Sequence, residues 1–204
     1  MAMAVRAQSR ARGDRKAQGR RWLGGLLLAA MAASGTWPGR DARAQKPSRD
    51  DVQAAYLYNF GKFVRWPEGA GHGPIQVCVA GQDPFAQTVG QLVAGERIGG
   101  RGVEVRNLDE PEGVGSCSIL FVGAPERART DAFLSAADGK PVLTVGEGPD
   151  FLTRGGMIQF VLVEDHVRFS VNLEAANRCN VGLSSELLKV AVSVTPRPET
   201  GGTK

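Results

Sequence analysis

The sequence predicts an α/β fold, with a mostly parallel sheet, helices on both of its faces and a C-terminal hairpin. Short apolar runs alternate along the chain with longer segments in which apolar residues recur at helical spacing. Strands separated by helices favour a parallel sheet, because a parallel connection needs a long crossover. Near the C-terminus two runs with period-two patterning follow each other directly, which predicts the hairpin.

The first predicted element is a helix over residues 50–64. Asp50 suits its N-cap, because a carboxylate can accept a hydrogen bond from a free backbone N–H of the first turn. Aromatic residues at helical spacing predict its buried face: Tyr56, Phe60 and Phe63. The Trp66-Pro67 pair ends the helix, since the residue before a proline avoids helical backbone.

Four apolar runs are the next predicted strands: 75–80, 103–107, 117–122 and 141–145. The run at 117–122 is the most apolar, and we expect it at the centre of the sheet, where both faces are buried. A helix is predicted to begin with Asp83 as N-cap and Pro84 at its first position, and another over 126–137. A short helical turn at 150–154 follows the fourth strand.

The predicted hairpin joins residues 157–163 to 167–172, which alternate between apolar and polar side chains. Two helices, 173–181 and 184–194, are expected after it. Pro196 and Pro198 begin a polar tail, 196–204, that is expected to be disordered. The body between this tail and residue 44 shows no repeat, so 45–195 is predicted to be a single domain.

Residues 1–44 have the order of a secretory signal peptide: an arginine-rich start, a short apolar run and a small-residue cleavage pattern. The apolar run 22–33 is too short to span a membrane, which needs roughly 20 residues. Cleavage after Ala44 would leave no stable membrane insertion and a mature chain that begins near Gln45. The pattern predicts a periplasmic protein, exported by the general secretory or the twin-arginine route.

The basic character of the chain belongs to this leader. Of 25 basic and 21 acidic side chains, nine and two lie in residues 1–44. The rest therefore carries 16 basic and 19 acidic groups, a net charge of −3. A mildly acidic body argues against a nucleic-acid partner.

The sequence contains no recognisable catalytic constellation. A Walker A loop and a G-x-G-x-x-G motif are both missing, and Ser184 is better explained as a helix cap than as a nucleophile. His72 and His166 fall in a loop and a turn, far from any cysteine pair. We therefore expect a non-enzymatic protein with no cofactor and no metal site. From their spacing alone, Cys78, Cys117 and Cys179 could include one bridge or be three buried thiols.

Several blocks of the sequence resemble the YfiR family of periplasmic regulators: 54–67 (AAYLYNFGKFVRWP), 75–85, 117–123, 169–176 and 182–191. The resemblance implies an exported protein, often a homodimer, that binds the sensor part of an inner-membrane diguanylate cyclase and restrains it, lowering cyclic di-GMP. It also implies a bridge between Cys78 and Cys117. A second cysteine pair of some members has no counterpart near Phe151, so regulation through a second bridge is not expected.

Two sets of residues are candidates for binding. An aromatic and arginine combination suits a partner surface, and its members are Arg65, Trp66, Phe151, Arg168 and Phe169. Turns at the carboxyl ends of the strands suit a small ligand, and their members are Gly81, Gln82, Asp83, Gly123 and Gly146. Core packing and ordinary turns remain alternatives for both sets. The second set belongs to the competing function, a periplasmic small-ligand receptor without enzymatic activity.

Overall fold

The computed structural model describes residues 46–70 and 73–195. The predicted signal peptide (1–44) and tail (196–204) lie outside these ranges. The described residues form an eight-stranded sheet in the order β10-β8-β7-β6-β5-β2-β4-β3. Its neighbouring strands are parallel except for the antiparallel pairs β7–β8 and β3–β4. The predicted α/β fold with its mostly parallel sheet and hairpin is therefore confirmed.

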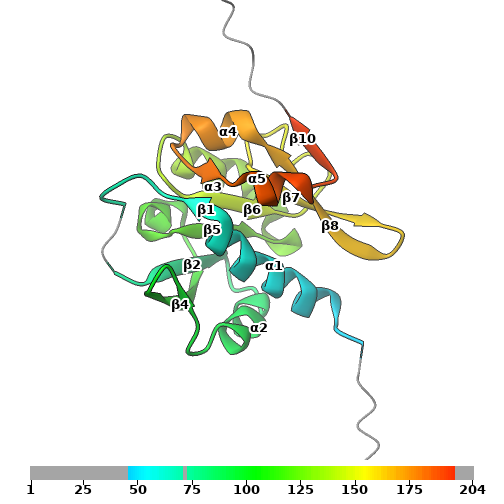
Figure 1. The fold of residues 1–204 in the computed structure, drawn as a ribbon, viewed down its shortest axis with the longest axis horizontal. Coiled ribbons are helices and arrows are strands. Elements are labelled where there is room, and N and C mark those ends of the chain that lie inside the picture. The colour runs from blue at the N-terminus through cyan, green and yellow to red at the C-terminus, as the bar shows by residue number, and fades with distance from the viewer. Residues whose placement is uncertain (1–45, 71–72, 196–204) are drawn as a thin grey trace, which may run out of the picture. The chain divides into compact units, whose positions relative to one another are not determined.

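The strands of this sheet are β2 (Ile75–Ala80), β3 (Arg97–Ile98), β4 (Arg101–Leu108), β5 (Ile119–Val122), β6 (Leu143–Gly146), β7 (Ile158–Val163), β8 (His166–Asn172) and β10 (Ser193–Thr195). A separate antiparallel pair joins β1 (Val64–Arg65) to β9 (Gly182–Leu183). The helices are α1 (Arg49–Phe63), α2 (Phe85–Leu92), α3 (Thr130–Ala137), α4 (Leu173–Arg178) and α5 (Ser185–Lys189). Two 3₁₀ helices, η1 (Pro111–Ser116) and η2 (Ala124–Arg129), complete the described elements (Figure 1).

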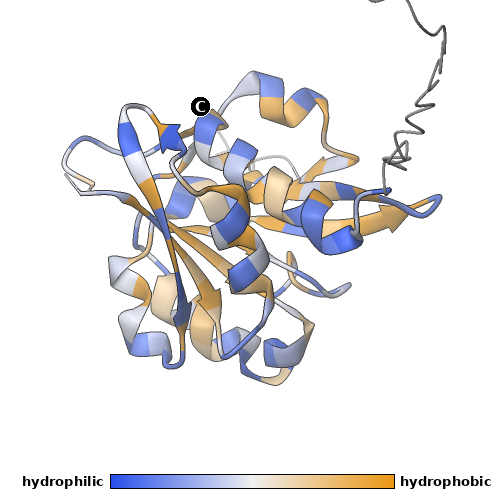
Figure 2. Cartoon of the chain, turned by 90° about the horizontal axis from the view of Figure 1, so that it is seen from below, coloured by the Kyte–Doolittle hydropathy of each residue, from blue (hydrophilic) through white to orange (hydrophobic). Residues whose placement is uncertain are grey.

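Strand alternation divides the interior into two cores, one on each face of the sheet. In β2, Val77 and Val79 pack into the core that also holds α1, α2, α4 and α5. Cys78 and Ala80 point to the opposite face and pack with η1 and α3. Figure 2 shows the strands between the helices as strongly hydrophobic, with hydrophilic residues spread over the helices. Among the described residues, no helix is both long and apolar enough to cross a bilayer.

Some predicted boundaries were wrong, for identifiable reasons. The N-cap of α1 is Ser48, not Asp50: its hydroxyl accepts from the Asp51 N–H at 3.1 Å, and the Asp51 carboxylate accepts from the Ser48 N–H at 2.9 Å. The helix predicted over 173–181 ends at Arg178, and Asn180 follows with left-handed backbone, φ 55°.

The largest error concerns the predicted helix 184–194. Its helical part, α5, ends at Lys189, and the chain then pairs with the edge of the sheet as β10. The Val192 N–H donates to the Phe169 carbonyl at 2.8 Å, and β10 continues this pairing in parallel with β8. Pairing with the edge of β8 satisfies backbone groups that would otherwise have no partner within the sheet.

The helix predicted over 126–137 begins instead with η2 and becomes α-helical at Thr130.

Candidate functional site

The strand order creates a switch point between β2 and β5. After β2 the chain forms α2, which packs on one face of the sheet. After β5 it forms η2 and then α3, and α3 packs on the other face. Open α/β sheets bind ligands beyond the carboxyl ends of their strands at such a point. The predicted ligand residues all lie at this edge, after β2, after β5 or at the end of β6: Gly81, Gln82, Asp83, Gly123 and Gly146.

The protein's own carboxylates occupy the helix starts at this edge. Asp83 accepts a hydrogen bond from the Phe85 N–H, the first residue of α2, at 2.9 Å. Glu147, just after β6, accepts from the Ala124 N–H at the start of η2 at 3.1 Å. Its other oxygen accepts from Arg49 at 2.7 Å and Gln53 at 2.8 Å. Groups that would bind an anionic ligand are thus already paired within the chain.

Close packing explains the three glycines of this predicted ligand set. A Cβ at Gly81, where φ is +69°, would overlap the Glu126 carboxylate. A Cβ at Gly123 would lie 2.6 Å from Asp83 Oδ2, and one at Gly146 would overlap the Phe151 ring. Glycine is needed at these positions to let neighbouring side chains approach the backbone. A bound ligand is not required to account for them.

Two of the five predicted partner residues are core residues. Phe151 and Phe169 are each 1% exposed. Phe151 packs in the core on the α3 face, and the Phe169 ring centroid lies 4.9 Å from that of Phe60 in α1. Neither side chain can contact a partner in this conformation, which corrects their assignment to a partner surface. Sheet packing, the alternative that the sequence left open, accounts for both.

Arg65 and Trp66 lie together at the end of the first helical segment. Arg65 is exposed in β1. Hydrogen bonds from the Glu186 backbone and from the side chains of Ser184 and Ser185 hold the pKa of Glu186 below its ordinary value, and the charge of Arg65 adds to this effect. Trp66 is partly buried against the core that contains α1. The structure does not bring either residue to the hairpin that carries Arg168.

Arg168 lines a groove between the start of α1 and the β7–β8 hairpin. We call this the hairpin groove; its volume is about 470 Å³, and it is lined by Lys46, Pro47, Ser48, Arg49, Val52, Tyr56, Leu162, Asp165, His166, Val167 and Arg168. Tyr56 donates a hydrogen bond to the Val167 carbonyl at 3.4 Å across it. Leu162 is 54% exposed, because the hairpin extends beyond α1 (Figure 1). The groove thus combines apolar side chains with basic ones.

Sequence reasoning identified Arg168 but missed the apolar part of the groove. Leu162 lies directly opposite Val167 in the hairpin, so both side chains share one face. Only Val167 is buried, while Leu162 and its neighbour Val163 are exposed. In the sequence, the available signal of this apolar part was Leu162, an apolar residue close to the acidic turn 164–165. The sequence could not show that α1 stops short of covering it.

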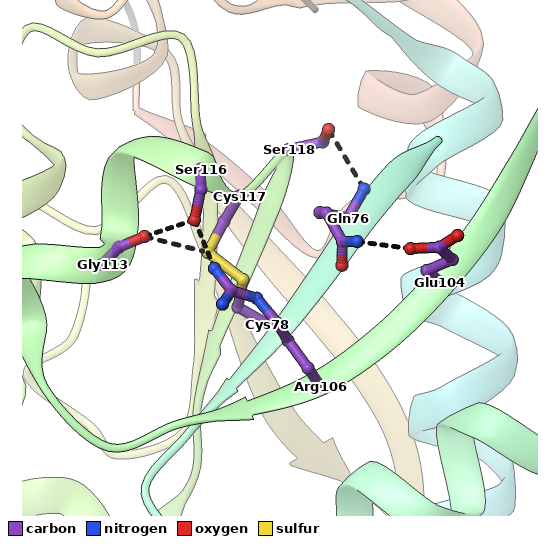
Figure 3. Close-up of a disulfide and its surroundings, with 8 residues drawn as sticks. All are labelled: Gln76, Cys78, Glu104, Arg106, Gly113, Ser116, Cys117 and Ser118. Atoms are coloured by element: carbon purple, nitrogen blue, oxygen red, sulfur yellow. Dashed lines mark hydrogen bonds between the residues drawn. A yellow bond between two sulfur atoms is a disulfide. The ribbon is translucent and has the colours of Figure 1, made fainter. Parts of the chain in front are cut away.

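A disulfide joins Cys78 in β2 to Cys117, which precedes β5 (Figure 3). The structure therefore contains the bridge that the family resemblance implied. The bridge lies in the α3-side core, next to η1. Cys179 is a free thiol, 4% exposed, at the end of α4. Burial raises the pKa of the Cys179 thiol, which keeps it in the unreactive protonated form at neutral pH.

A comparison with known families covers most of the described residues. A family described as YfiR/HmsC-like matches residues 50–192, which is most of the chain. The chain belongs to the YfiR/HmsC-like family. This family is periplasmic, regulatory and non-catalytic, and it is associated with the control of diguanylate cyclases. A search of curated proteins gives no match.

One solved structure agrees at the level of the fold. A conserved domain protein from Vibrio cholerae O1 biovar El Tor superposes with a TM-score of 0.51 at 10% identity, over 72% of this chain and 60% of that one. The ABC domain in complex with L-Trp from Streptococcus pneumoniae superposes with a TM-score of 0.47 at 9% identity, over the same shares. The chain thus spans about 60% of the length of these structures. At such identity the first likeness supports only the fold, and the second is too weak to support even that.

Proposed function

We propose that this protein is an exported, non-catalytic regulator that binds the periplasmic sensor part of an inner-membrane diguanylate cyclase and restrains it, lowering cyclic di-GMP. The family match over residues 50–192 carries this proposal. One observation supports it. At the switch-point edge, where an α/β enzyme would hold its substrate, Asp83 and Glu147 accept hydrogen bonds from the N–H groups at the starts of α2 and η2.

Restraint by binding requires a difference in affinity. The regulator must bind the inactive state of the sensor more tightly than the active state, because equal affinity shifts no equilibrium. If the free sensor populates both states equally, holding 99% of it inactive takes about 2.7 kcal/mol of differential affinity. One or two interface side chains can supply this, since a hot-spot residue contributes about 2 kcal/mol or more.

The hairpin groove is the surface we assign to the partner. Exposed Leu162 and half-buried Tyr56 offer apolar contact, and Lys46 and Arg168 add positive charge beside them. Arg49, also in the groove, is already paired with Glu147 at 2.7 Å. Among the described residues that line it, Asp165 is the one acidic side chain. This composition fits a partner segment that carries both apolar and acidic side chains.

A pair of matched variants tests this interface. Leu162→Asp places a charge in the groove, and Val190→Asp places one at an exposed valine outside it, 63% exposed after α5. We expect Leu162→Asp to weaken binding of the sensor domain about thirtyfold, the effect of losing a hot-spot residue. Val190→Asp should bind as the unaltered protein does. The measurement is affinity for the sensor domain of the cyclase captured by crosslinking in the periplasm, with each variant first checked for its thermal transition. Equal binding by both variants contradicts the assignment of the groove.

Homodimer formation is part of the same proposal, on the strength of the family. Sedimentation velocity of the exported protein measures it, and a monomer at micromolar concentration contradicts it.

Export is proposed from the leader sequence. We expect the intact mass of the protein recovered from the periplasm to correspond to a chain that begins at or near Gln45, because Ala42-Arg43-Ala44 fits a signal-peptidase site. A mass that still includes residues 1–40 contradicts cleavage. Replacing Arg20 and Arg21 by lysine separates the routes, since twin-arginine export depends on this pair and general secretion does not.

A further inference from the structure

The β7–β8 hairpin extends beyond the strands on either side of it (Figure 1). On one side, β6 pairs with β7 only at Ile158 and Gln159. The residue after β6, Glu147, donates its N–H to Val122 of β5 at 3.1 Å, so the chain has left β7 there. On the other side, β10 pairs with β8 only at residues 170–172. The outer half of the hairpin is therefore a two-stranded arm.

The two edges of this arm differ. The edge of β8 is partly covered within the chain, because the Val167 carbonyl accepts a hydrogen bond from the Tyr56 hydroxyl at 3.4 Å. The Phe169 carbonyl likewise accepts from the Val192 N–H at 2.8 Å. Among the described residues, no strand other than β8 pairs with β7 beyond Gln159. The edge of β7 is thus the open one.

The hydrogen-bond pattern of the hairpin shows which backbone groups face this open edge. The Asn172 N–H donates to the Met157 carbonyl at 2.8 Å. In an antiparallel pair the residues bond to the neighbouring strand alternately, so every second residue from Met157 to Val163 bonds to β8. Leu162 lies between two of these residues. It therefore directs its N–H and its C=O toward the open side.

The side chains along the open edge are apolar: Val161, Leu162 and Val163. Leu162 is 54% exposed and Val163 is 41% exposed. Exposed edge strands usually carry charged side chains or proline, which prevent pairing with another chain. β4, near the opposite end of the sheet, follows this rule with its exposed Glu104 and Arg106. The edge of β7 has no such protection and is suited to pairing with another strand.

We propose that β7 of a second copy of this chain pairs antiparallel with this edge, across a two-fold axis at Leu162. The inference rests on the homodimer of the proposed function and names its surface. The two Leu162 residues would exchange a pair of N–H to C=O hydrogen bonds. An axis at Val161 would instead place Val163 of the second copy beside Gln159, where β6 already lies. An axis at Val163 would require the turn residues 164–165, whose φ values are 49° and 59°, to continue the strand.

This register is self-complementary, which favours a second copy over an unrelated strand. Val161 of each copy lies opposite Val163 of the other, and Leu162 lies opposite Leu162. Apolar side chains therefore meet apolar ones at all three positions, and such cross-strand pairs stabilise a sheet. Residues directly opposite each other share a face, so the hairpin grooves of both copies would open on the same face of the joined sheet.

Cysteine crosslinking tests the register directly. Val161→Cys chains are mixed with Val163→Cys chains and mildly oxidised. We expect crosslinked dimers from the mixture, because directly opposite residues lie within the Cα distance that a disulfide spans, up to about 7 Å. Either variant alone should crosslink far less, since its two cysteines would lie diagonally, about 7–8 Å apart. A mixture of Val190→Cys with Val163→Cys is the matched control, because Val190 is 63% exposed but lies after α5, outside the hairpin.

Sedimentation velocity measures the same contact at equilibrium. Val163→Asp is expected to weaken self-association at least about tenfold, because it buries two carboxylates in an apolar contact. Val190→Asp should associate as the unaltered protein does. Val163 is changed in place of Leu162 because Leu162 also lines the hairpin groove.

The outcomes separate this inference from the proposal on which it rests. An unaltered protein that is monomeric at micromolar concentration overturns the homodimer, and the edge contact with it. If the unaltered protein is a dimer that Val163→Asp leaves intact, or if the mixture crosslinks no more than the control, the edge contact alone is overturned. A dimer that stays intact in Val163→Asp while binding of the captured sensor domain falls assigns the edge to the sensor and not to a second copy.

Discussion

Replacing Phe169 with alanine is expected to lower the free energy of unfolding by about 3–5 kcal/mol, the usual cost of deleting a buried phenylalanine. Phe169 packs edge-on to Phe60 at 4.9 Å and to Tyr56 at 5.6 Å between ring centroids. These rings join α1 to the inner face of the hairpin. A cavity here would therefore loosen both elements at once. Urea unfolding followed by circular dichroism measures the change.

Arg168→Ala is the matched control, since it removes the exposed neighbour on the same strand. It should change stability by no more than about 0.5 kcal/mol. A Phe169→Ala protein that keeps its stability but loses its partner would contradict the packing account and return Phe169 to the partner surface. The expected result is the reverse, a destabilised protein whose remaining folded fraction still binds.

Removing the disulfide is expected to have an effect of similar size. The bridge closes a loop with a sequence separation of 39 residues. In the chain-entropy description such a loop contributes about 4 kcal/mol, by restricting the unfolded chain. This is a large part of the total of about 5–15 kcal/mol for a typical domain. The double variant Cys78→Ala/Cys117→Ala should therefore unfold at a clearly lower urea concentration than the unaltered protein.

A reducing agent provides the control for this variant. It should destabilise the unaltered protein by a similar amount and leave the double variant unchanged, because Cys179 is buried and unpaired. If reduction does not change the stability of the unaltered protein, the bridge does not contribute to stability as described. Non-reducing peptide mapping would identify which cysteines are linked in that case.

The sequence was most informative where burial is complete. β2 and β5 were predicted because each is apolar at nearly every position, as a strand covered on both faces must be. β10 was missed because its three residues, of which only Val194 is partly buried, follow directly on a helical pattern and were split between the predicted helix and the chain after it, although Val194 and Thr195 are β-branched. Its conformation depends on the unpaired edge of β8, which the local sequence does not reveal. The cap of α1 was placed two residues late, because Ser48 and Asp50 are both good capping residues.

For the candidate sites as well, the sequence located the segments but not the contacts that depend on tertiary packing. The turns after β2, β5 and β6 were located from the carboxyl ends of the predicted strands, but Glu147 was not recognised as the carboxylate that accepts a hydrogen bond at one of them. Its contact with Arg49 joins residues 98 positions apart in the sequence. Phe151 and Phe169 look like recognition residues in sequence, and only tertiary packing shows them to be buried.

The central claim is that this protein restrains a diguanylate cyclase. The cellular concentration of cyclic di-GMP, compared between a strain that lacks the protein and its parent, tests this claim most directly. We expect the concentration to rise when the protein is removed and to return when the unaltered chain is restored, whereas Leu162→Asp should fail to restore it. An unchanged concentration in the strain that lacks the protein would contradict the account.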